Sequence, residues 1–242
     1  MTSSPSADTV TTPTATTKAL LTASHLNKTV QVGEQTLSII KDVNVHINAG
    51  EFVVIMGKSG SGKSTLLGLL AALDYPDSGT VKLADQMLSS LDEDALAAIR
   101  QRDMGFVFQS FHLLPTLTVA ENIAFPLDIA RQPNPARVDE LIEAVGLGHR
   151  RDSLPNQLSG GEQQRTAVAR ALVSHPKIVF ADEPTGNLDE QNADQVMQLL
   201  LDLRQKVGSA LVVVTHDPAL AEMADRVITM HDGMIDGLVA NG

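Results

Sequence analysis

Residues 57–65 have the composition and spacing of a loop that binds phosphate. They read Gly-Lys-Ser-Gly-Ser-Gly-Lys-Ser-Thr and stand between two apolar runs, 52–56 and 66–73. Glycines allow the backbone to turn sharply and direct N–H groups at phosphate oxygens, and a helix that begins here adds its positive end. We expect Lys63 to contact the β- and γ-phosphates of a nucleotide and Ser64 to ligate Mg²⁺. The expected phosphate-binding residues are Gly57, Lys58, Ser59, Gly60, Ser61, Gly62, Lys63, Ser64 and Thr65.

Two carboxylates, Asp182 and Glu183, follow the apolar run 178–181. An acidic pair after a strand is by itself equally typical of a solvated helix start. Together with a phosphate loop, the pair indicates a metal site, because enzymes with a phosphate loop hold Mg²⁺ with a carboxylate at a strand end. We expect Asp182 to hold the magnesium ion, mainly through water, and Glu183 to act as general base for the attacking water.

The runs that precede these polar residues indicate how they are brought together. Residues 52–56, 178–181 and 211–214 are continuously apolar, which is typical of parallel strands buried on both faces. Each run ends in polar residues: Gly57 onward, Asp182 with Glu183, and 215–217. Ligands of open α/β sheets bind beyond the carboxyl ends of the strands, so we expect these three ends to meet at one site.

The remaining segments complete an α/β fold. Residues 36–40 and 43–47 alternate between apolar and polar, which indicates half-exposed antiparallel strands. Helical segments are expected over 92–102, 119–129, 135–145 and 161–174, separated by Gly and Pro. We therefore expect a P-loop NTPase core of the RecA-like type with a parallel sheet, an amino-terminal antiparallel β subdomain and an inserted helical subdomain at roughly 90–175. Residues 1–19 are expected to be a disordered tail and 20–242 the folded unit.

Composition excludes several classes of protein. A formal net charge of −11 at pH 7 argues against a protein that coats nucleic acid, so we expect no nucleic-acid partner. The absence of Cys excludes a disulfide framework and a thiolate metal site. The apolar runs are far shorter than the roughly 18 residues of a spanning helix, and residues 1–19 lack the features of a signal peptide.

The segment Leu158-Ser-Gly-Gly-Glu-Gln-Gln-Arg165 distinguishes among the many phosphate-loop proteins. It resembles the signature of ABC ATPases at every position, and the resemblance extends over residues 20–242. Ser159 followed by Glu162 is also a helix cap, and both interpretations can hold because such a helix start presents N–H groups to an anion. The resemblance implies that two cassettes pair head to tail, so that Ser159, Gly160 and Gly161 contact ATP bound by the second copy.

Three further motifs of this family occur in the expected order. Gln109 matches the glutamine that touches Mg²⁺ and the attacking water and senses the membrane partner, Asp189 ends the segment that matches the D-loop, and His216 matches the histidine that contacts the γ-phosphate. The resemblance thus implies ATP and Mg²⁺ as cofactors. The implied catalytic residues are Glu183, His216, Lys63 and Gln109, and the implied metal-binding residues are Ser64, Gln109 and Asp182.

Two longer stretches, 105–122 and 180–189, resemble the bacterial lipoprotein-releasing and macrolide-exporter branch of ABC ATPases. Residues 26–39 further resemble an export ATPase associated with a periplasmic lysophospholipase. The resemblance implies an ATP-hydrolysing subunit of an export or extraction complex with two partners, a second cassette and an integral membrane permease. It would lie on the cytoplasmic face of the inner membrane and contact the membrane only through that permease. The alternatives are a soluble ABC ATPase with a non-membrane partner and a nucleotide-gated regulator, which the presence of Glu183 and His216 argues against.

Position 30 departs from the family pattern. ABC cassettes usually place an aromatic residue there to stack on adenine, and this chain has Val30. Stacking of a base on an aromatic side chain is worth roughly 1–3 kcal/mol at nucleic-acid sites. We therefore expect weaker selection of adenine, with the phosphate contacts providing most of the binding free energy.

Overall fold

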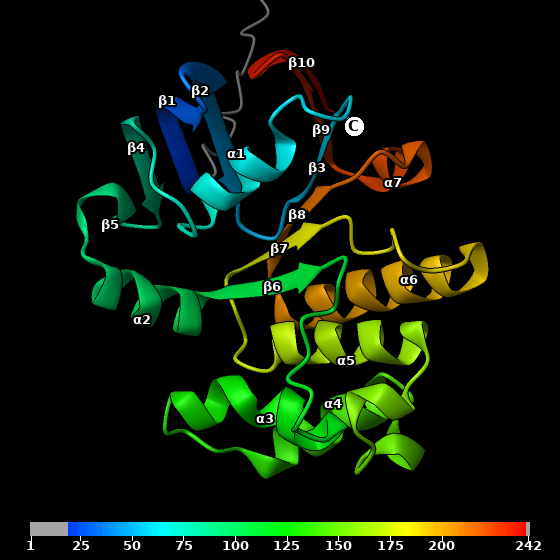
Figure 1. Cartoon of the computed structure of the whole chain (residues 1–242). Coiled ribbons are helices and arrows are strands. Elements are labelled where there is room, and N and C mark those ends of the chain that lie inside the picture. The colour runs from blue at the N-terminus through cyan, green and yellow to red at the C-terminus, as the bar shows by residue number, and fades with distance from the viewer. Residues whose placement is uncertain (1–18, 241–242) are drawn as a thin grey trace, which may run out of the picture.

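The computed structural model describes residues 19–240 and contains two sheets (Figure 1). The larger sheet has six strands in the order β10-β9-β3-β8-β7-β6. All neighbours in it are parallel except β10, which is antiparallel to β9. Its strands are β3 (Phe52–Gly57), β6 (Met104–Phe108), β7 (Ile178–Asp182), β8 (Ala210–Val214), β9 (Arg226–His231) and β10 (Met234–Ala240).

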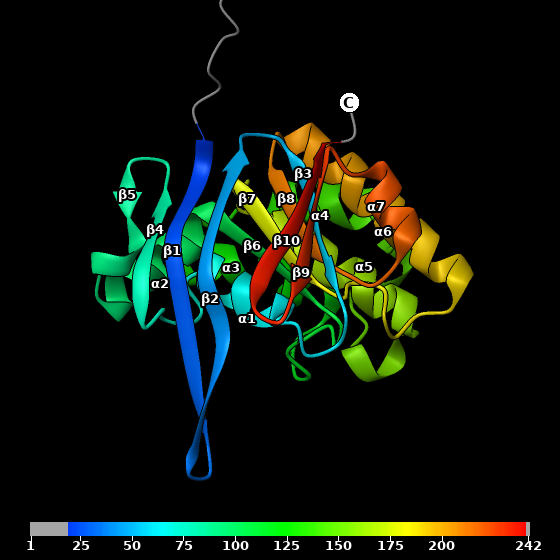
Figure 2. The same ribbon diagram turned by 90° about the horizontal axis from the view of Figure 1, so that it is seen from above.

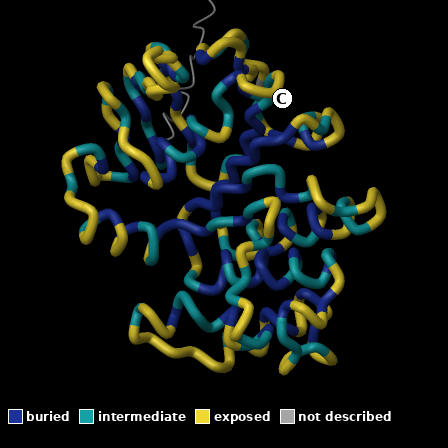
Figure 3. Tube along the Cα trace, viewed as in Figure 1, coloured by how far each residue is buried: buried dark blue, intermediate teal, exposed yellow. Residues whose placement is uncertain are grey.

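The central strands are buried on both faces, which explains their continuous apolar sequences (Figure 3). In β3, Val53 and Ile55 pack into one hydrophobic cluster, and Phe52 and Val54 pack into a second cluster on the opposite face. All five residues of β8 are buried. The prediction from the apolar runs is confirmed: β3, β8 and β7 are parallel neighbours, so their carboxyl ends lie at one edge of the sheet.

The smaller sheet is antiparallel and has the order β2-β1-β4-β5. Its strands are β1 (Ala19–Val32), β2 (Gln35–Asn48), β4 (Ser78–Leu83) and β5 (Gln86–Met87). Strands β1 and β2 form a long hairpin whose tip projects beyond the rest of the molecule (Figure 2). The two alternating segments expected at 36–40 and 43–47 are parts of the single strand β2, which continues through a left-handed residue, Asp42.

Helices fill the space between the sheets and cover the far face of the larger one (Figure 1). Helix α1 (Lys63–Leu70) buries four leucines in the cluster that also contains the inner face of the antiparallel sheet. The opposite face of the core sheet packs against a second group of helices. The other helices are α2 (Glu93–Asp103), α3 (Val119–Ile129), α4 (Pro135–Ala144), α5 (Gly160–Leu172), α6 (Glu190–Val207) and α7 (Pro218–Met223), with short 3-10 turns at Leu88–Ser90, Gly148–Arg150 and Pro155–Gln157.

The expected helices agree with α2, α3, α4 and α5 to within one or two residues. The expected helical insertion at roughly 90–175 needs correction, because it contains β6, a strand of the core sheet paired with β7. The expected tail, 1–19, lies outside the described residues except for Ala19, which begins β1. Among residues 19–240, no helix combines the length and the apolar composition that crossing a bilayer requires.

Candidate active site

The loop 57–62 connects β3 to α1 and has a backbone that requires glycine at both ends. Gly57 has φ +154°, and a Cβ there would lie 2.4 Å from the carbonyl oxygen of Met230. Gly62, the residue before α1, has φ +96°, and a Cβ there would lie 2.9 Å from the carbonyl oxygen of Ile39. Neither position accommodates a side chain. The loop is therefore clamped between the carboxyl-terminal strands and the β1–β2 hairpin.

The two polar side chains at the start of α1 point to opposite parts of the site. Lys63 Nζ donates to the carbonyl oxygens of Gly57 at 2.8 Å and Lys58 at 3.1 Å, so the ammonium folds back over the loop. Ser64 Oγ donates to Asp182 Oδ1 at 3.1 Å. The loop N–H groups and the ammonium together provide the positive potential that polyphosphate requires.

Asp182 has the properties of a metal ligand. Burial raises the pKa of its carboxyl group and the neighbouring Glu183 raises it further, while the hydrogen bond from Ser64 and the charge of Lys63 lower it. A carboxylate that is costly to ionise gains from a bound cation. The donor set fits Mg²⁺, which takes one or two protein oxygens and completes its shell with phosphate and water. No group of three or more His, Cys, Asp or Glu side chains within residues 19–240 could hold a metal alone.

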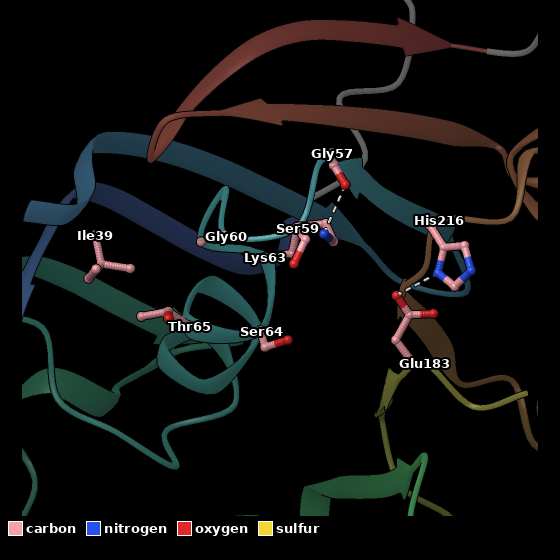
Figure 4. Close-up of a pocket in the computed structure, with 10 residues that line it drawn as sticks. Ile39, Gly57, Ser59, Gly60, Lys63, Ser64, Thr65, Glu183 and His216 are labelled. Carbon is pink, nitrogen blue, oxygen red and sulfur yellow. Dashed lines mark hydrogen bonds and ion pairs between the residues drawn. The ribbon is translucent and has the colours of Figure 1, made fainter. Parts of the chain in front are cut away.

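Glu183 and His216 face each other at the ends of β7 and β8 (Figure 4). Glu183 has φ +45°, a left-handed conformation that is uncommon for a residue other than glycine. Its N–H donates to the carbonyl oxygen of Val214 at 2.9 Å, and its Oε1 lies 3.1 Å from His216 Nδ1. The carboxylate faces His216, and backbone strain of this kind concentrates at functional sites.

These elements surround one cavity of about 560 Å³, within the size range of small-molecule sites. Its lining residues are Ile39, Gly57, Ser59, Gly60, Gly62, Lys63, Ser64, Thr65, Glu183 and His216 (Figure 4). All except Ile39 were expected from the sequence. Ile39 was missed because it belongs to the antiparallel sheet, and nothing in its sequence context indicates that the hairpin folds against the loop.

Other expected residues lie outside this cavity. Lys58 and Ser61 belong to the loop but do not line the cavity. Val30 is 43% exposed on β1, opposite Leu37 of β2. Gln109 follows β6, and its side-chain amide donates to Asn187 Oδ1 at 3.2 Å.

The signature segment forms the start of α5 and adjoins the start of α6. Ser159 Oγ accepts from the N–H of Glu162, whose carboxylate accepts from the N–H of Ser159, so the expected helix cap is present. Asp189 caps α6 in the same way by accepting from the N–H of Asn192. A Cβ on Gly161 would lie 2.7 Å from Asn192 Oδ1, and one on Gly160 would lie 3.4 Å from Leu188. Ser159, Gly160, Gly161 and Asp189 thus form a second group, separate from the residues that line the cavity in the same chain.

Sequence comparison gives close relatives. A family model described as ABC transporter matches residues 40–186. The lipoprotein-releasing system ATP-binding protein LolD of Shewanella frigidimarina is 48% identical over 228 residues, which are 93% of this chain and 95% of that protein. The macrolide export ATP-binding/permease protein MacB of Chlorobaculum tepidum is 47% identical over 213 residues, 87% of this chain. Those residues are 33% of that relative, so the chain spans about a third of the length of the MacB proteins it matches.

Structure comparison agrees with the sequence. The dimeric ATP-binding cassette MJ0796 in a post-hydrolysis state, bound to ADP and Pi, has a TM-score of 0.84 and 40% identity, covering 91% of this chain and 98% of that one. A second dimeric structure of MJ0796, described as a bacterial ABC transporter cassette, has a TM-score of 0.83 with the same identity and coverage.

Proposed function

Because the chain belongs to the ABC transporter family, we propose that it is the ATP-binding and ATP-hydrolysing subunit of a bacterial export or extraction complex. One observation carries this proposal: the phosphate loop, Glu183 and His216 line one cavity at the carboxyl edge of the core sheet. That arrangement provides a place for a triphosphate with an acid–base pair at its end.

The residues of the loop have distinct proposed roles. The N–H groups of 57–65 and the ammonium of Lys63 would bind the β- and γ-phosphates in place of the carbonyl oxygens that Lys63 now contacts. Ser64 and Asp182, whose Oγ and Oδ1 lie 3.1 Å apart, would hold Mg²⁺, Asp182 mainly through water. When bound, the ion supplies charge neutralisation of the γ-phosphate.

Glu183 is the proposed general base. Its carboxylate would accept a proton from the water that attacks the γ-phosphorus, and ADP is the leaving group. His216 now pairs with Glu183 Oε1 at 3.1 Å and would turn its ring toward the γ-phosphate when ATP enters. Gln109 would contact the ion and the attacking water from the end of β6.

The second group, Ser159 with Gly160, Gly161 and Asp189, is proposed to act on a partner copy. The relative MJ0796 is dimeric with ADP and Pi bound. In a head-to-tail pair, the start of α5 in one copy would contact the γ-phosphate held by Lys63 of the other copy. Loss of that phosphate would remove the contact, so hydrolysis would separate the two copies.

The membrane partner is proposed to be a separate permease subunit on whose cytoplasmic side the cassette lies. MacB relatives are named ATP-binding/permease proteins and are about three times the length of the matching region, whereas this chain covers 95% of LolD. LolD is named the ATP-binding protein of a lipoprotein-releasing system, which supports a permease on another chain.

Adenine is proposed to be held weakly. Val30 lies on the exposed hairpin and Ile39 is the residue of that sheet that lines the cavity. An aliphatic contact provides no stacking of the aromatic kind, so the phosphates would dominate binding.

Three variants and a membrane extraction test the proposed function. We expect Glu183→Gln to lower ATP turnover by about 100-fold or more while ATP binding persists, because a general base contributes at least that much. Lys63→Ala should lose both binding and turnover.

An integral membrane protein should co-purify with ATP-loaded Glu183→Gln from detergent extracts, and Asp94→Ala, an exposed position on α2 away from the cavity, serves as the matched control. Turnover of Glu183→Gln at the wild-type rate would overturn the base assignment. If no integral membrane protein co-purifies, a soluble ABC ATPase would be favoured.

A further inference from the structure

We propose that Asn187, with Gly186, forms a latch that holds Gln109 away from the phosphate site until nucleotide binds. Asn187 would be a positioning residue, because it acts through Gln109 and does not itself contact the reacting atoms. The inference rests on the proposed function of Gln109 and deepens it by assigning a role to two residues that the active site does not use.

Two hydrogen bonds join the side chain of Asn187 to Gln109. The amide of Gln109 donates through Nε2 to Asn187 Oδ1 at 3.2 Å, and Asn187 Nδ2 donates to the carbonyl oxygen of Gln109 at 3.0 Å. The pair therefore uses both the donor and the acceptor of the Asn187 amide. A residue with only one of these functions could make only one of the bonds.

Gly186 provides the space for this contact. A Cβ on Gly186 would lie 2.7 Å from Gln109 Nε2, 3.0 Å from Cδ and 3.3 Å from Cγ. Any larger residue would displace the Gln109 side chain. Gly186 has no positive φ, so its backbone does not require glycine, and the close approach of Gln109 is the observation that explains its lack of a side chain.

The backbone around Gln109 is fixed, so movement is left to the side chain. Buried Gln164 of α5 donates to the carbonyl oxygen of Pro184 and, at 3.4 Å, to that of Phe108. Phe108 pairs with Asp182 across the parallel strands β6 and β7, so Gln109 stands next to Glu183 at the sheet edge. Adjacent strands lie about 4.8 Å apart, which a glutamine side chain can span.

The latch and the nucleotide therefore compete for one side chain. Gln109 does not line the cavity while it is bonded to Asn187. Occupation of the site by Mg²⁺ and ATP would have to break the exposed bond from Gln109 Nε2 to Asn187 Oδ1, whereas the bond to the backbone carbonyl of Gln109 can remain. The apparent affinity is then reduced in proportion to the fraction of molecules in which the Gln109 side chain is free. The affected quantity is the concentration of Mg²⁺ that half-saturates ATP turnover.

The test compares three variants in two backgrounds. Asn187→Ala removes both bonds, Asn187→Asp keeps only the acceptor, and Gly186→Ala displaces Gln109 and leaves Asn187 in place. We expect Asn187→Ala and Gly186→Ala each to lower the half-saturating Mg²⁺ concentration about two- to fivefold, with Asn187→Asp between them and wild type. In the Gln109→Ala background, all three variants should give the same value, since no side chain remains to be held.

A second measurement does not depend on hydrolysis. The side-chain amide signals of Gln109 in ¹⁵N-labelled protein should shift when ATP and Mg²⁺ are added to Glu183→Gln, and nucleotide-free Asn187→Ala should already show part of that shift. Thermal unfolding establishes that each variant is folded.

Three results would overturn the latch. The first is an effect of Asn187→Ala on the half-saturating Mg²⁺ concentration that persists in the Gln109→Ala background. The second is a rise, rather than a fall, of that concentration in Asn187→Ala. The third is a side-chain amide signal of Gln109 that Asn187→Ala leaves unchanged. A wild-type chain that does not hydrolyse ATP would instead contradict the proposed function, and the amide signal would still report whether Asn187 holds Gln109.

Discussion

At the scale of single residues, the proposed weak binding of adenine rests on Ile39 and on Val30, where the resemblance to ABC cassettes implies an aromatic side chain. Val30 is exposed on the hairpin, while Ile39 touches the cavity and packs partly against the core. The base of a bound nucleotide would therefore meet a small aliphatic surface. Discrimination between adenine and guanine by such a surface is weak, because it presents no aromatic face or hydrogen-bonding group.

Substitution by Tyr tests this interpretation. We expect Val30→Tyr to tighten ATP binding about fivefold or more and to raise the preference for ATP over GTP, because an aromatic ring adds stacking. Calorimetric titration of both nucleotides measures the change. Gln31→Tyr, at the next position of β1 and therefore on the other face from Val30, is the matched control and should change neither value. Equal binding by Val30→Tyr and wild type would show that the base does not reach this strand.

The residues of the phosphate loop and the two strand ends could be predicted because their chemistry is contained in short contiguous segments. Ile39 and the bond between Gln109 and Asn187 could not, because each depends on how separate segments meet in space. Gln109 and Asn187 are 78 positions apart, and no sequence pattern pairs them. Tertiary contacts of this kind are visible only once the sheet order is known.

At the scale of elements, the segment after β6 stores backbone strain that α5 holds in place. Phe111 and His112 have φ values of +60° and +48°, two consecutive left-handed residues without glycine. Arg170 of α5 donates to both of their carbonyl oxygens, at 2.9 and 2.6 Å. Burial lowers the pKa of its guanidinium group, which shows that the charge is partly removed from water. The signature helix thus fixes the loop that carries Gln109.

Removal of this guanidinium should loosen the loop. We expect Arg170→Met, which keeps the apolar stem, to lower the free energy of unfolding by about 2 kcal/mol, because two charge-assisted hydrogen bonds are lost. Chemical denaturation measures the loss. The exposed Arg131→Met is the matched control, with an expected change within about 0.5 kcal/mol. If the two variants unfold alike, Arg170 does not stabilise the strained pair.

The sequence predicted the helices α2 to α5 and the central strands β3, β7 and β8, whereas β6 was not expected, and its omission has a physical cause. The helices α2 to α5 follow capping and apolar patterns that are local. Strand β6 has five residues, as β7 and β8 do, but it contains Gly105 and is paired on one side only, with β7. The glycine weakens the strand pattern, and the segment stands between two helical stretches, so the sequence does not separate it from the helical insertion.

At the scale of the whole molecule, net charge should control pairing of two cassettes. Each chain carries a formal charge of −11, so two copies repel each other over distances comparable to the Debye length, about 10 Å at 0.1 M salt. The interface must gain enough from ATP contacts to offset this repulsion. Salt that screens the repulsion should therefore assist the pair.

We expect two ATP-bound cassettes to associate more tightly as the salt concentration rises. For ATP-loaded Glu183→Gln, the dissociation constant of the pair should fall when NaCl rises from about 50 to about 300 mM, because screening weakens long-range repulsion. Analytical ultracentrifugation measures it. Lys63→Ala should remain single at each concentration, since it lacks the nucleotide that joins the copies. Pairing that weakens with salt would mean that ion pairs across the interface outweigh the net charge.

The position of β3 has a consequence for synthesis of the chain. This strand ends in the phosphate loop, yet both of its neighbours, β8 and β9, come from residues 210–231. The loop is also bonded to the final turn, where Gly233 N–H donates to the carbonyl oxygen of Ser61 at 3.1 Å. A ribosome must therefore make nearly the whole polypeptide before residues 57–65 reach their final shape. The phosphate loop is therefore made early but reaches its final shape only after strands from the other end of the described chain have been made.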